Sequence, residues 1–154
     1  MTKKVITGVI IAYIIMLILQ FTFVKYDNPP VLNEPVWDSE QTKQTFKNLC
    51  ADCHSNETKW HWYSYIPPVS FLIQYDVSTG RREFNVSEYK KEDGIKAAYE
   101  FNKGEMPLRV YTLIHSDPAL QGVEKEKFRQ GLEATFGKYD KEELEQNRYS
   151  HPEE

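Results

Sequence analysis

The longest apolar stretch of the chain lies at its amino terminus. Residues 5–24 read VITGVIIAYIIMLILQFTFV and carry no formal charge, whereas Lys3 and Lys4 stand just before them. A helix of this length extends about 30 Å, the thickness of the hydrocarbon core of a bilayer. The run is longer than the apolar part of a signal peptide, and no small-x-small cleavage site follows it. We therefore predict that residues 1–24 form an uncleaved signal-anchor helix across the membrane, in preference to a cleaved signal peptide or a buried core helix.

The orientation of this helix follows from the charges around it. Basic residues that flank a span stay in the cytoplasm, so Lys3 and Lys4 place the short amino terminus inside. The remainder of the chain is then expected outside the cytoplasmic membrane, in the periplasm, behind a single-pass anchor in contact with lipid. Residues 25–37 are rich in proline, which resists helix formation and favours extended chain. We interpret them as a linker, a spacer that holds a domain away from the lipid.

Beyond residue 37 the apolar residues recur at helical spacing, and no segment alternates with the period of a strand. The sequence therefore predicts an all-α domain over residues 38–136, followed by a charged tail, residues 137–154, that is a solvated helix end or disordered. Four helices are expected. The first is capped by Asp38 or Ser39 and has Phe46, Leu49, Cys50 and Cys53 on one face. The second starts near Pro68, stops at Gly80, and has on one face Val69, Leu72, Ile73, Asp76 and Val77. The third covers residues 92–103 with Ile95, Ala98 and Tyr99 inward and ends at Gly104, and the fourth covers residues 123–136 with Phe128, Leu132 and Phe136 on one stripe.

Composition and net charge limit the classes of molecule that the protein could bind. The 154 residues include 19 Lys and Arg against 23 Asp and Glu, which gives a net charge of -4. The chain has no basic stripe with interleaved aromatic residues, so nucleic acid is not expected as a partner. Its length leaves room for the anchor and one domain.

The only two cysteines of the chain lie in the run Cys50-Ala51-Asp52-Cys53-His54. A C-x-x-C-H run is typical of c-type haem attachment. Thiols at this spacing can form thioether bonds with both vinyl groups of one porphyrin, and the adjacent imidazole is then directed at the iron, for which histidine is a normal ligand. We predict one covalently attached haem, held by Cys50 and Cys53, with His54 on the iron.

Other uses of two cysteines remain open. The pair could form a dithiol redox site, a structural disulfide, or half of a zinc site completed by His61 and another histidine. Zinc lacks a second cysteine pair here, and a thioredoxin-like site needs a βαβ context that the pattern does not show. A plain disulfide would not require the neighbouring histidine. Haem attachment is therefore favoured.

Three stretches carry a resemblance to a known family. They are CADCHSNETKWHWYSYIPPVSFLIQYDVSTGR over residues 50–81, Asn85-Val86-Ser87, and GEMPLRVYTLIH over residues 104–115. With them, residues 49–120 resemble the small haem-binding domain of bacterial exported proteins, a relative of c-type cytochromes. The resemblance implies a CxxCH haem site in a mostly helical, cytochrome c-like domain, often behind a membrane anchor. It implies no particular reaction.

A second iron ligand is expected from the residues after the third helix. Met106 is favoured, because it follows the Gly104 helix stop and precedes Pro107, and Met/His ligation suits electron transfer. His115 is the rival and would give a bis-histidine haem, whereas water or no ligand is the third alternative. His61 lies too close to His54 in sequence to reach the opposite face, and His151 falls in the charged tail.

Further haem contacts are expected from aromatic, proline and arginine residues. Flat aromatic side chains suit a porphyrin, and ligating histidines usually donate their other ring N–H to a fixed acceptor. Guanidinium groups can pair with the propionates. The candidates are Trp60, Trp62 and Tyr63 against the ring, the carbonyl of Pro67 or Pro68 as acceptor, and Arg81, Arg82 and Arg109 for the propionates. Each aromatic residue could equally belong to the core, and surface arginines are common.

These features favour a membrane-anchored monohaem electron carrier over an enzyme. Its partners would be other redox proteins, which an acidic surface would select by their basic patches. The alternatives are a peroxidase-like or ligand-binding haem protein with an open sixth site, for which His115 and Arg109 are the only distal candidates, and a haem sensor or assembly factor. A dithiol oxidoreductase remains only if no haem attaches.

Overall fold

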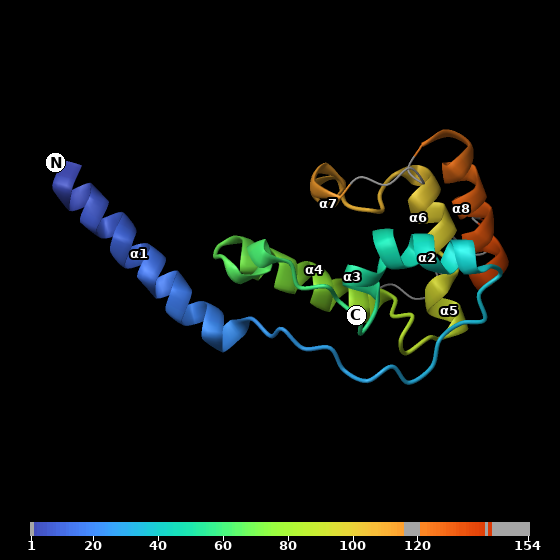
Figure 1. Cartoon of the computed structure of the whole chain (residues 1–154), viewed down its shortest axis with the longest axis horizontal. Coiled ribbons are helices and arrows are strands. Elements are labelled where there is room, and N and C mark those ends of the chain that lie inside the picture. Colours follow the sequence, from blue (N-terminus) through green and yellow to red (C-terminus); the bar gives the residue numbers. More distant parts are fainter. Residues whose placement is uncertain (1, 116–120, 141, 143–154) are drawn as a thin grey trace.

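The computed structural model describes residues 2–115, 121–140 and 142, so most of the expected charged tail lies outside the described residues. Within these ranges the fold is all-helical, as predicted, with no strand beyond one parallel bridge between Asn33 and Glu88. The helices, shown in Figure 1, are α1 (Thr2–Phe23), α2 (Glu40–Leu49), α3 (Ala51–His54), the 3-10 helix η1 (Trp62–Tyr65), α4 (Val69–Glu83), α5 (Lys91–Gly94), α6 (Ala97–Lys103), α7 (Arg109–Ile114) and α8 (Gly122–Phe136).

Helix α1 stands away from the rest of the chain (Figure 1). An 18-residue stretch of this 22-residue helix has a mean hydropathy of 2.4, and the apolar side chains of the helix are almost all exposed. The helix is long and apolar enough to cross a membrane, as predicted. Only Gln20 of α1 is buried, together with Val24 just after the helix, so the end of α1 contacts the domain while its beginning does not.

The hydrophobic core is formed by α2, α6 and α8 and by the chain that follows α4. Phe46, Phe84 and Phe136 meet edge to face at its centre, with ring centroids 5.1–6.0 Å apart. Ser39 caps α2 by accepting a hydrogen bond from the Thr42 N–H, as expected for a serine at this position. Helix α8 covers the predicted range, and the residues predicted for its inward face are all buried: Phe128, Leu132 and Phe136.

Two of the expected helices are broken in the structure. The first ends at Leu49, because Cys50 has non-helical dihedral angles (φ -125°, ψ -34°), and the cysteine motif continues as the separate short helix α3. The helix expected over residues 92–103 is divided into α5 and α6, which are separated by Ile95 and Lys96. Its end at Gly104 is confirmed, since this residue adopts the left-handed conformation at φ 79°.

The stop predicted at Gly80 is wrong, because α4 continues to Glu83. Gly80 is buried inside the helix where α4 crosses α3. A Cβ atom on this residue would lie 2.5 Å from the carbonyl oxygen of Cys53. Glycine is therefore required here by the close approach of two helices and not by a turn.

Residues 25–37, which we call the strap, are extended as their prolines predicted, and they are bonded to the domain. The strap runs along the domain and is tied to it by side-chain and backbone hydrogen bonds, three of them from the backbone N–H groups of Lys25, Leu32 and Asn33. Extended backbone leaves N–H and C=O groups that need partners, and the domain supplies them. The bonds include Lys25 N–H to Gln74 Oε1 (2.9 Å), Tyr26 Oη–H to Ser64 O (2.9 Å), Asn28 Nδ2–H to Thr58 O (2.9 Å), Leu32 N–H to Ser87 O (2.8 Å) and Asn33 N–H to Ser87 O (3.2 Å).

Candidate functional site

A cavity of about 550 Å³ opens beside the cysteine motif. This volume lies within the range of roughly 300–1,000 Å³ typical of cofactor and ligand sites. The wall is partly aromatic, with charged residues from α4, α5 and α6. Its lining consists of Phe46, Cys50, His54, Arg82, Glu83, Phe84, Asp93, Lys96, Ala97, Glu100, Phe101, Met106 and Leu132.

Both thiols of the motif are half-buried and unpaired. Burial raises the pKa of Cys50 well above its usual range, and the neighbouring Cys53 adds to this effect. Burial, assisted by the charges of Asp76 and Asp52, raises the pKa of Cys53 to about 12. Dithiol exchange needs a thiolate, so the raised pKa of both thiols disfavours it at neutral pH. Among the residues that the structure describes, no group of three or more His, Cys, Asp or Glu side chains could hold a metal ion.

His54 is fixed in one orientation by the end of α4. Its Nδ1 atom lies 2.9 Å from the carbonyl oxygen of Phe84, and since a carbonyl only accepts, Nδ1 carries the proton. Burial lowers the pKa of His54 although its backbone hydrogen bonds oppose this, so the ring is neutral at pH 7. A neutral imidazole with a proton on Nδ1 leaves a lone pair on Nε2, which is the tautomer that binds a metal.

The prediction that Pro67 or Pro68 accepts this hydrogen bond is wrong. Both prolines precede the first residue of α4, whereas Phe84 follows its last residue. A helix of this length extends about 22 Å, which separates the two ends. The chain after α4 instead returns along α3, where the Val86 N–H also bonds to the carbonyl of His54 at 2.9 Å.

Met106 lines the same cavity as Cys50 and His54. It follows the left-handed Gly104 after α6, and its backbone N–H bonds to the carbonyl of Glu100 at 3.3 Å. The peptide bond between Met106 and Pro107 is cis, and the side chain remains 38% exposed. The structure therefore brings Met106 near the motif, while its role as an iron ligand stays a prediction.

The rival ligand His115 lies elsewhere. It is not part of the cavity wall, and its Nε2 atom lies 3.2 Å from the Tyr63 hydroxyl. Its ring stacks on Tyr111, with centroids 4.2 Å apart, and lies 4.7 Å from the ring of His61. The histidine thus belongs to a separate cluster that packs beside Asp52 of the motif.

This cluster docks α7 onto the motif through Asp52. The Tyr111 hydroxyl donates to Asp52 Oδ2 at 2.9 Å, and the Lys59 N–H donates to Asp52 Oδ1 at 2.9 Å. His61 Nε2 lies 3.6 Å from the same carboxylate. Burial, with help from Asp52, raises the pKa of Tyr111, so its hydroxyl keeps its proton for this bond. The sequence offered no signal for this pairing.

The aromatic residues predicted to contact a haem do not line the cavity. Trp60 packs against Tyr26, Trp62 is 75% exposed, and Tyr63 contacts His115. The aromatic walls come instead from Phe46, Phe84 and Phe101, whose burial follows from the helical faces of α2 and α6 and the turn after α4. Pro67 is buried but also lies away from the cavity lining.

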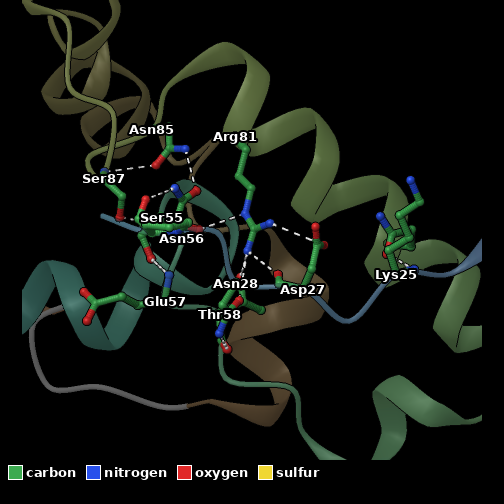
Figure 2. A network of polar contacts seen from close by, with 12 residues as sticks. Lys25, Asp27, Asn28, Ser55, Asn56, Glu57, Thr58, Arg81, Asn85 and Ser87 are labelled. Carbon is green, nitrogen blue, oxygen red and sulfur yellow. Dashed lines mark hydrogen bonds and ion pairs between the residues drawn. The ribbon is translucent and has the colours of Figure 1, made fainter. Parts of the chain in front are cut away.

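Arg81 was predicted to pair with a propionate, but it does not line the cavity, and its Nε and Nη2 atoms donate hydrogen bonds within the protein. Figure 2 shows that it reaches the loop after the motif and the start of the strap. Its donors bond to Ser55 O (2.9 Å), Asp27 O (3.1 Å), Asn28 Oδ1 (3.0 Å) and Thr58 Oγ1 (2.9 Å). Arg81 therefore ties together three segments of the chain and is not available to an anion in the cavity.

The cations that do line the cavity are Arg82 and Lys96. Arg82 is exposed, and among the described residues its guanidinium group makes only long contacts, 3.8 Å with Glu83 and 3.5 Å with Thr79. Arg109 is exposed at the start of α7 and is not part of the cavity wall. Of the three arginines predicted, the structure brings only Arg82 to the site, and Lys96 was missed because a surface lysine carries no distinguishing local signal.

A second set of buried polar residues holds the loop that follows His54 (Figure 2). The Asn56 N–H donates to Ser87 Oγ at 2.9 Å, and the Asn85 amide donates to Asn56 Oδ1 at 2.9 Å. Asn56 Nδ2 donates in turn to Pro30 O and Glu88 Oε1, each at 3.0 Å. These bonds join the strap, the loop that follows His54 and the segment after α4. We call this set of hydrogen-bonded residues, together with Arg81, the polar frame.

Comparison with known proteins identifies one family. Residues 14–134 match the profile of a family described as a haem-binding domain. The matched range begins inside α1, includes the whole strap and every residue of the cavity wall, and ends inside α8. No curated protein and no solved structure matches the chain. The residues present fit a haem, because the Cys50 thiol, a neutral imidazole, a thioether, aromatic walls and two cations line one cavity. Cys53, the second thiol of the motif, is not part of the cavity wall.

Proposed function

Because the chain belongs to the haem-binding domain family, we propose that it is a membrane-anchored monohaem c-type cytochrome that carries electrons at the outer face of the cytoplasmic membrane. Cys50 and Cys53 bond the haem covalently, and His54 binds its iron. The observation that supports this most directly is the hydrogen bond between His54 Nδ1 and the Phe84 carbonyl at 2.9 Å. It leaves Nε2 free for a metal in the same cavity as Cys50 and Met106.

The surrounding residues have distinct roles in this proposal. A bound haem supplies an iron that exchanges one electron between its ferrous and ferric states. Met106 would bind the iron together with His54, and a thioether ligand would favour the ferrous state and so raise the reduction potential. Arg82 and Lys96 offset the charge of the propionates at the cavity wall. Phe46, Phe84 and Phe101 exclude water, which keeps the environment of the iron apolar.

The anchor and the charge of the protein determine which partners it can reach. In this proposal helix α1 holds the domain at the membrane, and the basic residues before it favour a periplasmic position for the domain. The strap is bonded to the domain, so the domain stays close to the lipid instead of moving on a flexible tether. The net charge of -4 favours redox partners with basic surfaces and makes their association weaker at high salt.

The proposal is tested first on the full chain from a host able to attach haem. The intact protein should exceed the mass of its polypeptide by one haem, and its reduced spectrum should be that of low-spin iron. It should also remain in the membrane after alkaline carbonate extraction. A colourless protein with the mass of the bare polypeptide would contradict the haem assignment, and release by carbonate would contradict the anchor.

A pair of variants distinguishes the two sixth-ligand candidates. Met106→Ala should convert the low-spin spectrum to high spin, because the thioether is removed from the cavity. His115→Ala should leave the spectrum unchanged, since His115 is held by Tyr63 and Tyr111 outside the cavity wall. The reverse pattern would assign the ligand to His115.

One observation favours a second function, in which the sixth position opens to a small ligand. The Met106 side chain is 38% exposed, so it is less tightly packed than the buried residues behind it. Rapid binding of carbon monoxide by the reduced wild-type protein would support a ligand-binding or sensing role. Against a peroxidase-like reaction, neither His115 nor Arg109 lies in the cavity wall to act as a distal acid or base.

A further inference from the structure

An uncharged surface lies at the end of the domain nearest to α1. Residues 60–75 contain no Asp, Glu, Lys or Arg, and they form η1 and the first two turns of α4. Six of their large side chains point outward instead of into the core. We call this surface the η1–α4 face; it consists of Trp62 (75% exposed), Tyr65 (47%), Ile66 (40%), Val69 (40%), Leu72 (52%) and Tyr75 (65%).

The distribution of side chains on the first half of α4 is the reverse of that expected in water. The buried residues of this helix are Ser70, Val77 and Gly80, while Leu72 and Tyr75 are exposed. A surface helix normally turns its apolar stripe to the core and its polar side chains to solvent. The first half of α4 therefore presents to its surroundings the side chains that a soluble domain would bury, which marks a site of contact with a partner or a membrane.

The position of the η1–α4 face is set by α1 and the strap. The end of α1 contacts α4, and Gln20 and Val24 are buried there. Just after them the Lys25 N–H bonds to Gln74 Oε1, and the Tyr26 hydroxyl bonds to the Ser64 carbonyl, each at 2.9 Å. Figure 1 accordingly shows the start of α4 beside the carboxyl-terminal part of α1.

The aromatic rings reinforce this placement. Tyr26 lies against both Trp60 and Tyr65, with centroid distances of 5.3 and 4.5 Å. The face thus begins at the residues where the chain leaves the apolar helix, and it is continuous with that helix. Tryptophan and tyrosine are enriched at the level of the lipid headgroups, because each combines an apolar ring with a polar tip.

From these observations we infer that the η1–α4 face is seated in the lipid headgroup and upper acyl region of the membrane that α1 spans. This inference rests on the proposed anchor and adds to it a second, peripheral contact with lipid. Trp62, Leu72 and Tyr75 enter the interface, and the absence of charge over residues 60–75 removes the cost of desolvating ions there. The domain is then held in one orientation.

This orientation has a consequence for the cavity. Arg82, Glu83 and Phe84, which line the cavity, lie at the other end of α4 from the η1–α4 face. The helix extends about 22 Å, so the cavity stands at most about that far from the inserted end. A haem held there would be presented to partners above the membrane surface at a defined height, without free rotation of the domain.

The test uses the full chain in nanodiscs made either with ordinary phosphatidylcholine or with phosphatidylcholine brominated on its acyl chains, which quenches nearby tryptophan. One variant retains only Trp62 (Trp37→Phe with Trp60→Phe), and the matched control retains only Trp37 (Trp60→Phe with Trp62→Phe). Trp37 packs against Phe46 and Phe136 in the core. Comparing the two lipids for each variant cancels any quenching by the haem.

The fluorescence of the Trp62 variant should fall at least twofold in the brominated lipid, and that of the Trp37 variant should not change. An unchanged Trp62 signal in a chain that resists carbonate extraction would overturn this inference while leaving the anchor intact. Release of the chain by carbonate would instead overturn the proposed anchor itself. The two failures are therefore distinguishable.

A second measurement needs no tryptophan substitution. The unaltered chain in vesicles containing a photoactivatable phosphatidylcholine should form lipid adducts on peptides from residues 62–75, as well as on α1. The double substitution Leu72→Ser with Tyr75→Ser should lower the adducts on residues 62–75 severalfold and leave those on α1 unchanged. Adducts confined to α1 in the unaltered chain would contradict the seating of the face in lipid.

Discussion

The two sides of α3 are built in opposite ways. The side toward the strap is polar and filled: Ser55, Asn56, Thr58 and Ser87 are 0–5% exposed, and each makes hydrogen bonds (Figure 2). The side toward α2 and α6 is hollow and lined by aromatic rings, the Cys50 thiol and the His54 imidazole. Helix α3 thus lies between the polar frame, whose groups are hydrogen-bonded, and the cavity.

The difference indicates that the polar frame stabilises the domain, whereas the cavity side holds the residues for the cofactor. Buried polar groups cost free energy unless they are bonded, so the frame holds its shape only if all of its partners are present. The cavity side has few such bonds, and its residues are placed there by the frame behind them. We expect substitutions in the frame to unfold the domain and substitutions in the cavity to change the bound cofactor. The following predictions test this division.

The largest effect is expected from removing both thiols. Cys50→Ala with Cys53→Ala should abolish covalent attachment of haem, because the chain has no other cysteine. The purified variant should have the mass of its polypeptide, while its circular dichroism should stay helical because the frame is untouched. Retention of a covalently bound haem would contradict the assignment of the motif.

Gly80→Ala should be strongly destabilising, since the new Cβ would lie 2.5 Å from the backbone oxygen of Cys53. Overpacking between two helices typically costs about 1–3 kcal/mol, and backbone offers little relief. Gly8→Ala is the matched control, because nothing lies within 4 Å of that position. Thermal unfolding of both variants in detergent measures the difference. Equal stability would mean that α3 and α4 do not cross as closely as the structure shows.

Arg81→Met should lower the free energy of unfolding by about 2–4 kcal/mol, because it leaves buried acceptors such as the Ser55 carbonyl without a donor. Arg82→Met, one residue away, should change stability by no more than about 0.5 kcal/mol, since that side chain is exposed. Arg82→Met should instead lower the reduction potential of the haem slightly, because a cation near the iron favours the ferrous state. Chemical denaturation and redox titration would separate the two effects.

The smallest effect is expected from Asp76→Asn. Burial raises the pKa of Asp76, so the folded protein binds this proton more tightly than the unfolded chain does. Its contribution to stability is therefore fully present below the usual pKa of about 4 and is lost as the pH rises through the raised value. The variant should be slightly more stable at pH 7, by less than about 1 kcal/mol, and its stability should depend less on pH just above that usual pKa. A loss of stability at pH 7 would show that the charged carboxylate has a partner.

Much of the site depended on contacts that no local pattern could predict. The acceptor for His54 lies 30 residues away in sequence, and the carbonyl of Asp27 lies 54 residues from Arg81. A proline closer to the motif in sequence was the more natural expectation, but α4 carries the following chain back to α3 and leaves the prolines at its far end. The same return brings Arg82 to the cavity and turns Arg81 toward the strap, although the two residues are adjacent.

The amino-acid sequence by itself determined the features that depend on neighbours along the chain: the apolar α1, the all-helical domain, the Ser39 cap, the Gly104 helix end and the spacing of Cys50, Cys53 and His54. Each follows from backbone preferences or side-chain periodicity over a few residues. Only the tertiary structure decided which carbonyl holds His54, which arginine faces the cavity, and why Gly80 must be glycine. Those choices depend on how α3, α4 and the strap meet in space, and a contact between distant segments leaves no trace in the local order of residues.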